Sequence, residues 1–188
     1  MTHSRPVEYK LHIVFKRTPK LRKLRLGDVE SKIIEHILTI LPELQSLDTS
    51  FLIDGDVLLK AQQPIAHLKD LIVRVHSMPP KFLWAWIARL VPHGGELERL
   101  VVQNAPVPPS FLSRLSDTTV PPFFLRKLDV LHGSSLRNLQ FYTYQLAPDD
   151  FQFLCVSFVK LEALLCAVVG QDLVGRRLSE NRMTYAYV

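Results

Sequence analysis

The sequence has little glycine and no apolar run long enough to cross a membrane. It contains seven glycines in 188 residues, and we find no glycine-rich phosphate loop, no G-x-S-x-G nucleophile elbow and no H-E-x-x-H pair. The longest apolar stretches, such as FLWAWIARLV, are far shorter than the about 20 residues of a membrane-spanning helix. The first residues, MTHSRPVEYK, lack the apolar core of a signal peptide. We therefore expect a non-enzymatic protein of the cytoplasm or nucleus, without membrane contact.

Cysteine is also scarce, and neither cysteine has the spacing of a metal ligand. Cys155 and Cys166 lie in the apolar stretches FQFLCVSF and LEALLCAV, where a thiol serves as a small hydrophobic side chain. The seven histidines never fall at metal-ligand spacing with cysteine or a carboxylate. The adjacent carboxylates Asp149 and Asp150 follow a proline at an expected helix start, where we expect one or the other to cap free backbone N–H groups. We expect no catalytic residue, no cofactor and no metal site.

What the sequence does contain is a six-residue pattern: leucine, two other residues, leucine, one other residue and a mostly aliphatic one. The pattern begins at seven leucines: Leu21, Leu44, Leu68, Leu97, Leu125, Leu136 and Leu161. Five of the six intervals between them are 23 to 29 residues long, which is the spacing of leucine-rich repeats. In a short strand the second leucine and the aliphatic residue point to one side, and the residue between them points to the other. One side is therefore core and the other a binding wall.

The residues upstream of the pattern predict a helix before each strand. Apolar residues spaced i, i+3, i+4 form one helix face, and they recur at Leu11, Val14 and Phe15, at Ile34, Ile37 and Leu38, at Trp84, Ile87 and Ala88, and at Phe151, Leu154 and Cys155. We expect helices near residues 8–17, 31–41, 80–91 and 148–159 and a shorter one near 109–116. Apolar and polar residues also alternate over 7–16, so a strand is the alternative to a helix in that segment.

These elements predict an α/β leucine-rich-repeat solenoid of about six repeats, a short irregular horseshoe. Its parallel strands form the concave wall and its helices the convex wall. The interval of 11 residues between Leu125 and Leu136 is irregular. Because HGSS lies between them, we expect two adjacent extended segments, 125–130 and 136–141. One is an insertion and the other the repeat strand, and the sequence leaves open which.

The chain resembles the repeat portion of F-box/leucine-rich-repeat proteins of the ribonuclease-inhibitor-like class, in particular the divergent fungal type. The resemblance covers about residues 7–172 and rests on the six-residue pattern, the helix ends TPKL and LPEL, and the passage LRNLQFYTYQLAPDDFQFL. It implies that the repeats hold a protein to be ubiquitylated, while an F-box binds the adaptor of a cullin ubiquitin ligase. No F-box is evident before Leu21, so the adaptor is a partner only if the full-length product has one.

The pattern divides the chain into a leucine-rich-repeat domain, residues 1–172, and a C-terminal tail, residues 173–188, that lies outside it. A solenoid needs polar caps because its open ends expose core, and neither end of this sequence resembles a cap. The sequence therefore leaves open whether the chain is part of a longer protein or a complete small protein.

The wall can be described by the residue between the second leucine and the aliphatic residue of each repeat. These residues are Arg25, Asp48, Ile72, Val101, Asp129, Gln140 and Leu165. The middle of the series is apolar and its ends are mostly polar, which is the anatomy of a protein-binding site. We predict that Ile72 and Val101 are apolar anchors and that Arg25, Asp48, Asp129 and Gln140 set charge complementarity. The alternative is that a neighbouring insertion covers the two apolar residues.

The net charge of +5 is concentrated near the N-terminus, where seven Lys or Arg and no acidic residue lie between Tyr9 and Gly27. The repeat places Lys16 and Arg17 on the outer helix and Lys23 and Arg25 on the strand, and such a split face contacts phosphates less well than a continuous stripe. We therefore expect a protein partner on the concave wall, with the chain as the substrate-recognition part of an F-box-like ubiquitin-ligase receptor. The alternatives are a scaffold without a ligase role and, less favoured, a nucleic-acid-binding protein.

Overall fold

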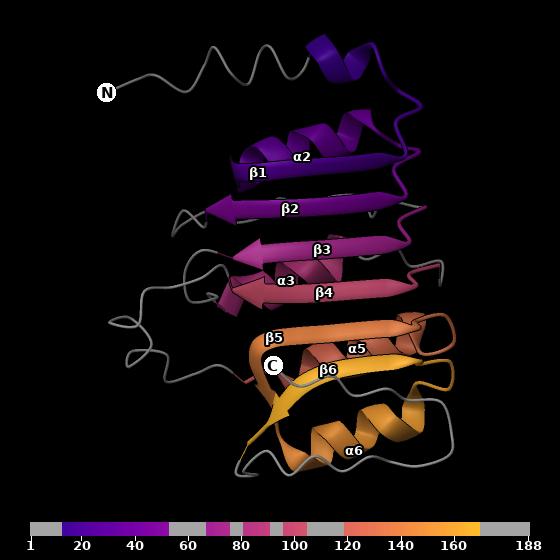
Figure 1. Ribbon diagram of the computed structural model, residues 1–188. Helices are drawn as coiled ribbons and strands as arrows, with labels where there is room; N and C mark the ends of the chain where they lie inside the picture. The colour runs from indigo at the N-terminus through magenta and orange to yellow at the C-terminus, as the bar shows by residue number, and fades with distance from the viewer. Residues whose placement is uncertain (1–12, 53–66, 76–80, 91–95, 105–118, 170–188) are drawn as a thin grey trace.

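The computed structural model describes residues 13–52, 67–75, 81–90, 96–104 and 119–169. A helical turn over residues 13–16 comes first. The elements that follow are β1 (Lys23–Glu30), α2 (Ser31–Ile40), β2 (Ser46–Leu52), β3 (Asp70–Val75), α3 (Lys81–Leu90), β4 (Arg99–Asn104), α5 (Pro122–His132), β5 (Asn138–Leu146), α6 (Pro148–Ser157) and β6 (Ala163–Val168). The strands form one parallel sheet in chain order. In Figure 1 the sheet faces the viewer, with α2, α3 and α5 behind it, and α6 packs against α5.

The six-residue pattern reappears as a straight row across this sheet. The second leucines of six repeats are paired strand to strand, and they are Leu24, Leu47, Leu71, Leu100, Leu139 and Leu164. All except Leu24 are buried on the helix side. The α/β architecture with a parallel sheet and helices against it therefore confirms the coarse prediction.

The turn that leads into each strand makes the same pair of hydrogen bonds in every repeat. The carbonyl oxygen of Arg22 accepts from the backbone N–H groups of Gln45 and Ser46 at 2.8 and 2.9 Å. The carbonyl oxygens that do the same for the next turn belong to Gln45, Lys69, Glu98 and Arg137. We call this series of hydrogen bonds the turn ladder. At each step one carbonyl oxygen accepts from two neighbouring backbone N–H groups, which provides both with a partner and fixes the register of the strands.

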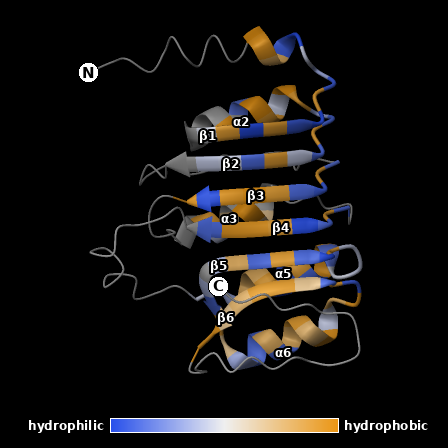
Figure 2. Cartoon of the chain, viewed as in Figure 1, coloured by the Kyte–Doolittle hydropathy of each residue, from blue (hydrophilic) through white to orange (hydrophobic). Residues whose placement is uncertain are grey.

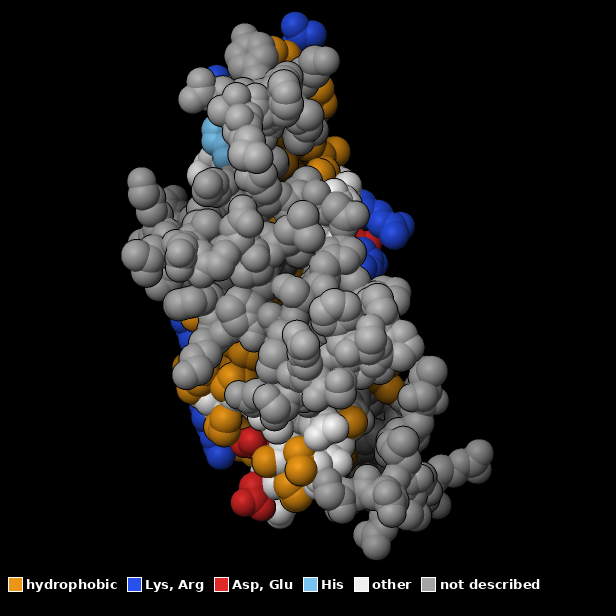
Figure 3. All heavy atoms as spheres, turned by 90° about the vertical axis from the view of Figure 1, so that its left-hand side faces the viewer, with side chains coloured by type: hydrophobic (Ala, Val, Ile, Leu, Met, Phe, Trp, Pro, Cys, Tyr) orange, Lys and Arg blue, Asp and Glu red, His pale blue; other side chains and the backbone are white. Residues whose placement is uncertain are grey.

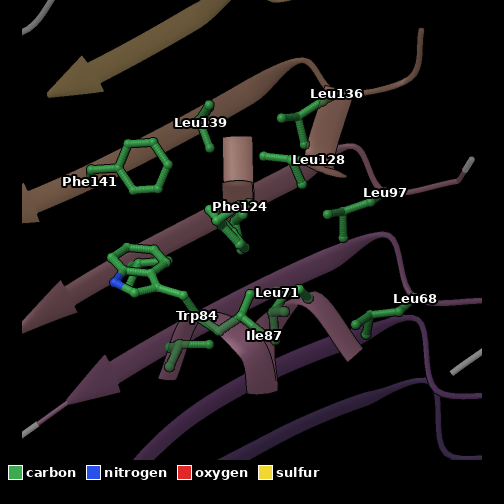
Figure 4. Packing of buried hydrophobic residues seen from close by; sticks show 14 of the residues in the cluster. Leu68, Leu71, Trp84, Ile87, Leu97, Phe124, Leu128, Leu136, Leu139 and Phe141 are labelled. Carbon is green, nitrogen blue, oxygen red and sulfur yellow. The ribbon is translucent and has the colours of Figure 1, made fainter. Parts of the chain in front are cut away.

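The core lies between the sheet and the helices, with Trp84 of α3 near its middle (Figure 4). The centroid of the Trp84 rings lies 4.9 Å from that of Phe124, 5.1 Å from that of Tyr144 and 6.0 Å from that of Phe141. Tilted and edge-on pairs of this kind stabilise a core beyond the area that they bury. The prediction that Trp84, Ile87 and Ala88 point inward is confirmed, because all three are buried.

The segment around Leu125 is a helix, so the prediction of a strand over 125–130 is wrong. Pro122 stands in the first turn of α5, where its fixed φ and missing N–H favour helix initiation. Leu125 and Leu128 are both buried, because leucines three residues apart also share one face of a helix. Segment 136–141 therefore supplies the repeat strand, and Asp129 lies on α5 instead of on the sheet.

The other expected helices are found where the structure describes the chain. α2, α3 and α6 match the predictions within two residues at each end. Residues 13–16 are helical, which contradicts a strand over that part of 7–16. The expected helix near 109–116 and the domain boundary at 172 lie outside the described residues. No helix in the described part combines the length and the apolarity that crossing a bilayer requires.

Candidate functional site

The candidate site is the face of the sheet opposite the helices, which we call the sheet wall. Strand alternation gives it two rows in register across all six strands. The first row is Lys23, Ser46, Asp70, Arg99, Asn138 and Ala163, and the second row is Arg25, Asp48, Ile72, Val101, Gln140 and Leu165. Figure 2 shows hydrophilic residues at both ends of β3 and β4 and hydrophobic ones between them. Of the six predicted site residues, the structure brings together five and leaves out Asp129.

An ion cluster of Arg25, Asp48 and Arg74 occupies the wall over β1 to β3. Arg74 donates from Nη1 to Oδ1 of Asp48 and from Nη2 to Oδ2 at 2.9 Å. Arg25 places Nε 3.4 Å from the same Oδ2. The side chain of Asp48 is 17% exposed, that of Arg74 25% and that of Arg25 78%. This wall ion cluster therefore has two well-shielded members and one that projects into solvent.

Arg74 is a wall residue that the six-residue pattern does not predict. The pattern gives one wall residue per strand, whereas Arg74 stands two residues after Ile72 and so points to the same face. A diagonal neighbour of this kind lies within reach of a long side chain on the adjacent strand. The period-two alternation of the sequence DLIVRV, continued one step beyond Ile72, is the signal that could have found it, and the burial of β3 follows the same alternation.

The structure buries Val101, one of the two residues predicted as apolar anchors. Ile72 is half-buried, but Val101 is only 3% exposed although it lies on the sheet wall. Its partners in the row are Ile72 on β3 and Gln140 on β5. Ile72 in the middle of this row and Leu165 at its end are the half-buried apolar residues that a partner can reach.

The chain is strongly basic where it enters the sheet. The described residues 13–27 contain no acidic side chain and six exposed cations, which we call the basic end: Lys16, Arg17, Lys20, Arg22, Lys23 and Arg25. Figure 3, in which the sheet face is at the right, shows Lys and Arg side chains beside an acidic one on that side. The carboxylate nearest to Arg25 is that of Asp48, which Arg74 already binds with two hydrogen bonds.

The charged residues farther along the turns are paired between neighbouring repeats. Lys69 lies 3.3 Å from Glu98, and Arg137 lies 2.8 Å from Glu162. All four side chains are about half exposed, so each pair stabilises the fold by less than about 1 kcal/mol. These cations are neutralised locally, whereas in the described part of the chain Arg25, beside Asp48, is the one cation of the basic end with an ion pair.

No family model, curated protein or solved structure matches the chain. Function is therefore inferred from the sheet wall itself.

The histidines, cysteines and carboxylates of the described residues are considered next as possible metal ligands or reactive groups. Among them, no group of three His, Cys, Asp or Glu side chains is placed to hold a metal ion. Cys155 and Cys166 are half-buried and pack against the core. Burial, together with the neighbouring thiol of Cys155, raises the pKa of the Cys166 thiol to about 12. That thiol stays protonated near neutral pH, as expected for a cysteine that serves as a small hydrophobic side chain.

Proposed function

We propose that this chain is a leucine-rich-repeat module that recognises a protein through the sheet wall. The observation that carries the proposal is the composition of the second row. Ile72 lies in its middle, with Asp48 on one side and Gln140 beyond Val101 on the other. An apolar centre flanked by polar and charged side chains is the usual anatomy of a protein interface.

The backbone supports this reading because it holds the wall in fixed positions. The wall residues come from repeats far apart in the sequence, yet the turn ladder and the strand pairing place them in register. A rigid surface loses little conformational entropy when a partner binds. The spacing of the repeats and the common row of second leucines support the leucine-rich-repeat assignment.

The resemblance to F-box/leucine-rich-repeat proteins supports a narrower form of the proposal. In this form the partner is a protein to be ubiquitylated, and the chain is the substrate-recognition part of an F-box-like receptor. The cullin adaptor then binds an F-box joined to these repeats in the full-length product. Copurification of the adaptor with the full-length product tests this form, and its absence there favours a scaffold without a ligase role.

Affinity capture with matched variants tests recognition by the wall. The native chain, Ile72→Asp and Val130→Asp are compared as baits in lysate of the source cells, with bound proteins quantified by mass spectrometry. Both changes replace an aliphatic residue by aspartate, but Val130 is 81% exposed on α5, away from the wall. We expect one set of proteins to bind the native chain and Val130→Asp and to be lost from Ile72→Asp.

The test needs a second wall variant because Ile72→Asp places a charge at a half-buried position. Gln140→Arg changes a residue that is already polar, and circular dichroism checks that each variant remains folded. Retention of the same proteins by both wall variants, or their loss from Val130→Asp alone, would place the interface elsewhere and overturn the proposal.

A further inference from the structure

We infer that the partner segment recognised by the wall is acidic: a short extended stretch whose carboxylates meet Lys23 and Arg25 while an aliphatic side chain packs on Ile72. This inference rests on the proposed function and specifies its partner.

The first step is the balance of charge on the wall. The two rows together with Arg74 contain four cations, Lys23, Arg25, Arg74 and Arg99, and two carboxylates, Asp48 and Asp70. The wall ion cluster has two guanidinium groups for one carboxylate, so it keeps one positive charge. The rest of the basic end adds to the same field without any acidic side chain within residues 13–27. Such a surface attracts acidic partners and repels basic ones.

The second step is the difference between the two arginines of the cluster. Arg74 directs both Nη atoms at Asp48 and is mostly shielded. Arg25 approaches Asp48 only through Nε and is 78% exposed. Among the described residues, no hydrogen bond from its Nη atoms is seen. A guanidinium group binds a second carboxylate well through such a free edge, so Asp48 orients Arg25 toward the partner.

The third step is spacing. Arg25 and Ile72 lie in the same row two strands apart, which corresponds to about 9.6 Å between their backbones. A polyproline-II segment rises about 3.1 Å per residue and returns to the same face every third residue. A partner segment that crosses the strands in this conformation therefore needs its acidic residue three positions from its aliphatic one.

The same features favour a peptide over a nucleic acid. A nucleic-acid site tracks the backbone with several cations that are free to bind phosphates. Here Arg74 is already held by Asp48, and the row leads from Arg25 to the apolar side chain of Ile72. An aliphatic residue two strands from an exposed guanidinium edge matches a segment that carries both an apolar and an acidic side chain.

Selection from a library of short random peptides displayed on phage tests the inference. The baits are the native chain, the double variant Lys23→Gln/Arg25→Gln, and Lys127→Gln/Lys160→Gln as a control. Lys127 lies on α5 and Lys160 in the turn after α6, both exposed, so the control loses the same charge away from the basic end. We expect the native chain and the control to select peptides with Asp or Glu three positions from an aliphatic residue.

The affinity of a selected peptide, measured by fluorescence anisotropy, gives the size of the effect. We expect it to fall by about tenfold or more in Lys23→Gln/Arg25→Gln, because charge-assisted hydrogen bonds are lost, and by less than about twofold in the control. An equal fall in the two double variants would mean that net charge alone is sensed, and would overturn the inference.

Three other outcomes separate this inference from the proposed function. An aliphatic consensus without acidic residues, lost in Ile72→Asp, leaves protein recognition standing and overturns the acidic partner. Selection of no consensus speaks against both. A labelled oligonucleotide that binds more tightly than the peptides at physiological salt, and is lost in Lys23→Gln/Arg25→Gln, assigns the basic end to nucleic acid and overturns the inference.

Discussion

Arg74 binds the carboxylate of Asp48 from the neighbouring strand, two residues beyond the position directly opposite it. This diagonal contact ties β2 to β3 on the face that the helices leave uncovered. Both side chains are mostly shielded from water, so removing one partner should cost more than it does in an ordinary surface pair, because it leaves a shielded charge poorly paired.

Arg74→Leu should lower the free energy of unfolding by about 1 to 2 kcal/mol, because it leaves Asp48 half-buried with only Arg25 beside it. Arg137→Leu removes an exposed partner of Glu162 and should cost less than about 1 kcal/mol. Urea denaturation measures both changes, and the double variant Asp48→Leu/Arg74→Leu should recover part of the loss. Equal costs for the two single variants would show that shielding adds nothing.

Gly133→Ala should destabilise the fold by about 1 to 3 kcal/mol through overpacking. A methyl group there would lie 2.8 Å from the backbone oxygen of Asp129 and 2.5 Å from Oδ1. Gly27→Ala is the control, since no atom lies within 4 Å of its added Cβ, and it should change stability by less than about 0.5 kcal/mol. Thermal unfolding of the two variants decides the point, and a neutral Gly133→Ala would contradict the close packing of this turn.

Thr49→Val should stabilise the protein by about 1 kcal/mol. Thr49 is fully buried in a register row whose next members are Val73, Val102 and Phe141, and its hydroxyl has no hydrogen-bond partner among the described residues. Valine has the same shape without the unsatisfied polar group. Thr39→Val is the control, because the exposed hydroxyl of Thr39 donates to the carbonyl of His36 at 2.7 Å. Chemical denaturation should show a gain only for Thr49→Val.

Stability should fall as pH rises between 9 and 12, in part because of Cys166. Burial, with the thiol of Cys155 adding to it, raises the pKa of the Cys166 thiol from 9.0 to about 12. Between these values the unfolded chain has lost a proton that the folded chain retains, so the free energy of unfolding decreases with pH. Cys166→Ala should flatten this slope by up to about 1.4 kcal/mol per pH unit. An unchanged slope would show that the thiol titrates alike in both states.

The leucine pattern predicted the register of the sheet because parallel repeats of similar length place equivalent residues side by side. Leu47, Leu71 and Leu100 fall in one row, and Trp84 and Ile87 face the core as their spacing indicates. Recognition and ligase roles stay predictions, since the fold does not determine the partner.

The sequence did not predict the helix around Leu125 or the burial of Val101, and both have local physical causes. Leucines three residues apart fit both the start of a repeat strand and one face of a helix, so Leu125 and Leu128 could not decide between them, whereas Pro122 favoured the helix. The burial of Val101 depends on what packs over its row in the folded chain, which a pattern within one repeat does not contain.

The turn ladder links each repeat only to the next, so the molecule behaves as a linear array whose terminal unit opens most easily. Leu24 is only partly buried, whereas Leu47 and Leu71 are fully buried, and amide hydrogen exchange should therefore be faster in β1 than in β3. This edge repeat also carries Lys23 and Arg25. A partner that binds those two side chains only when the first described repeat is folded would stabilise that repeat. The fraction of chains with this repeat folded would therefore rise as the partner concentration rises.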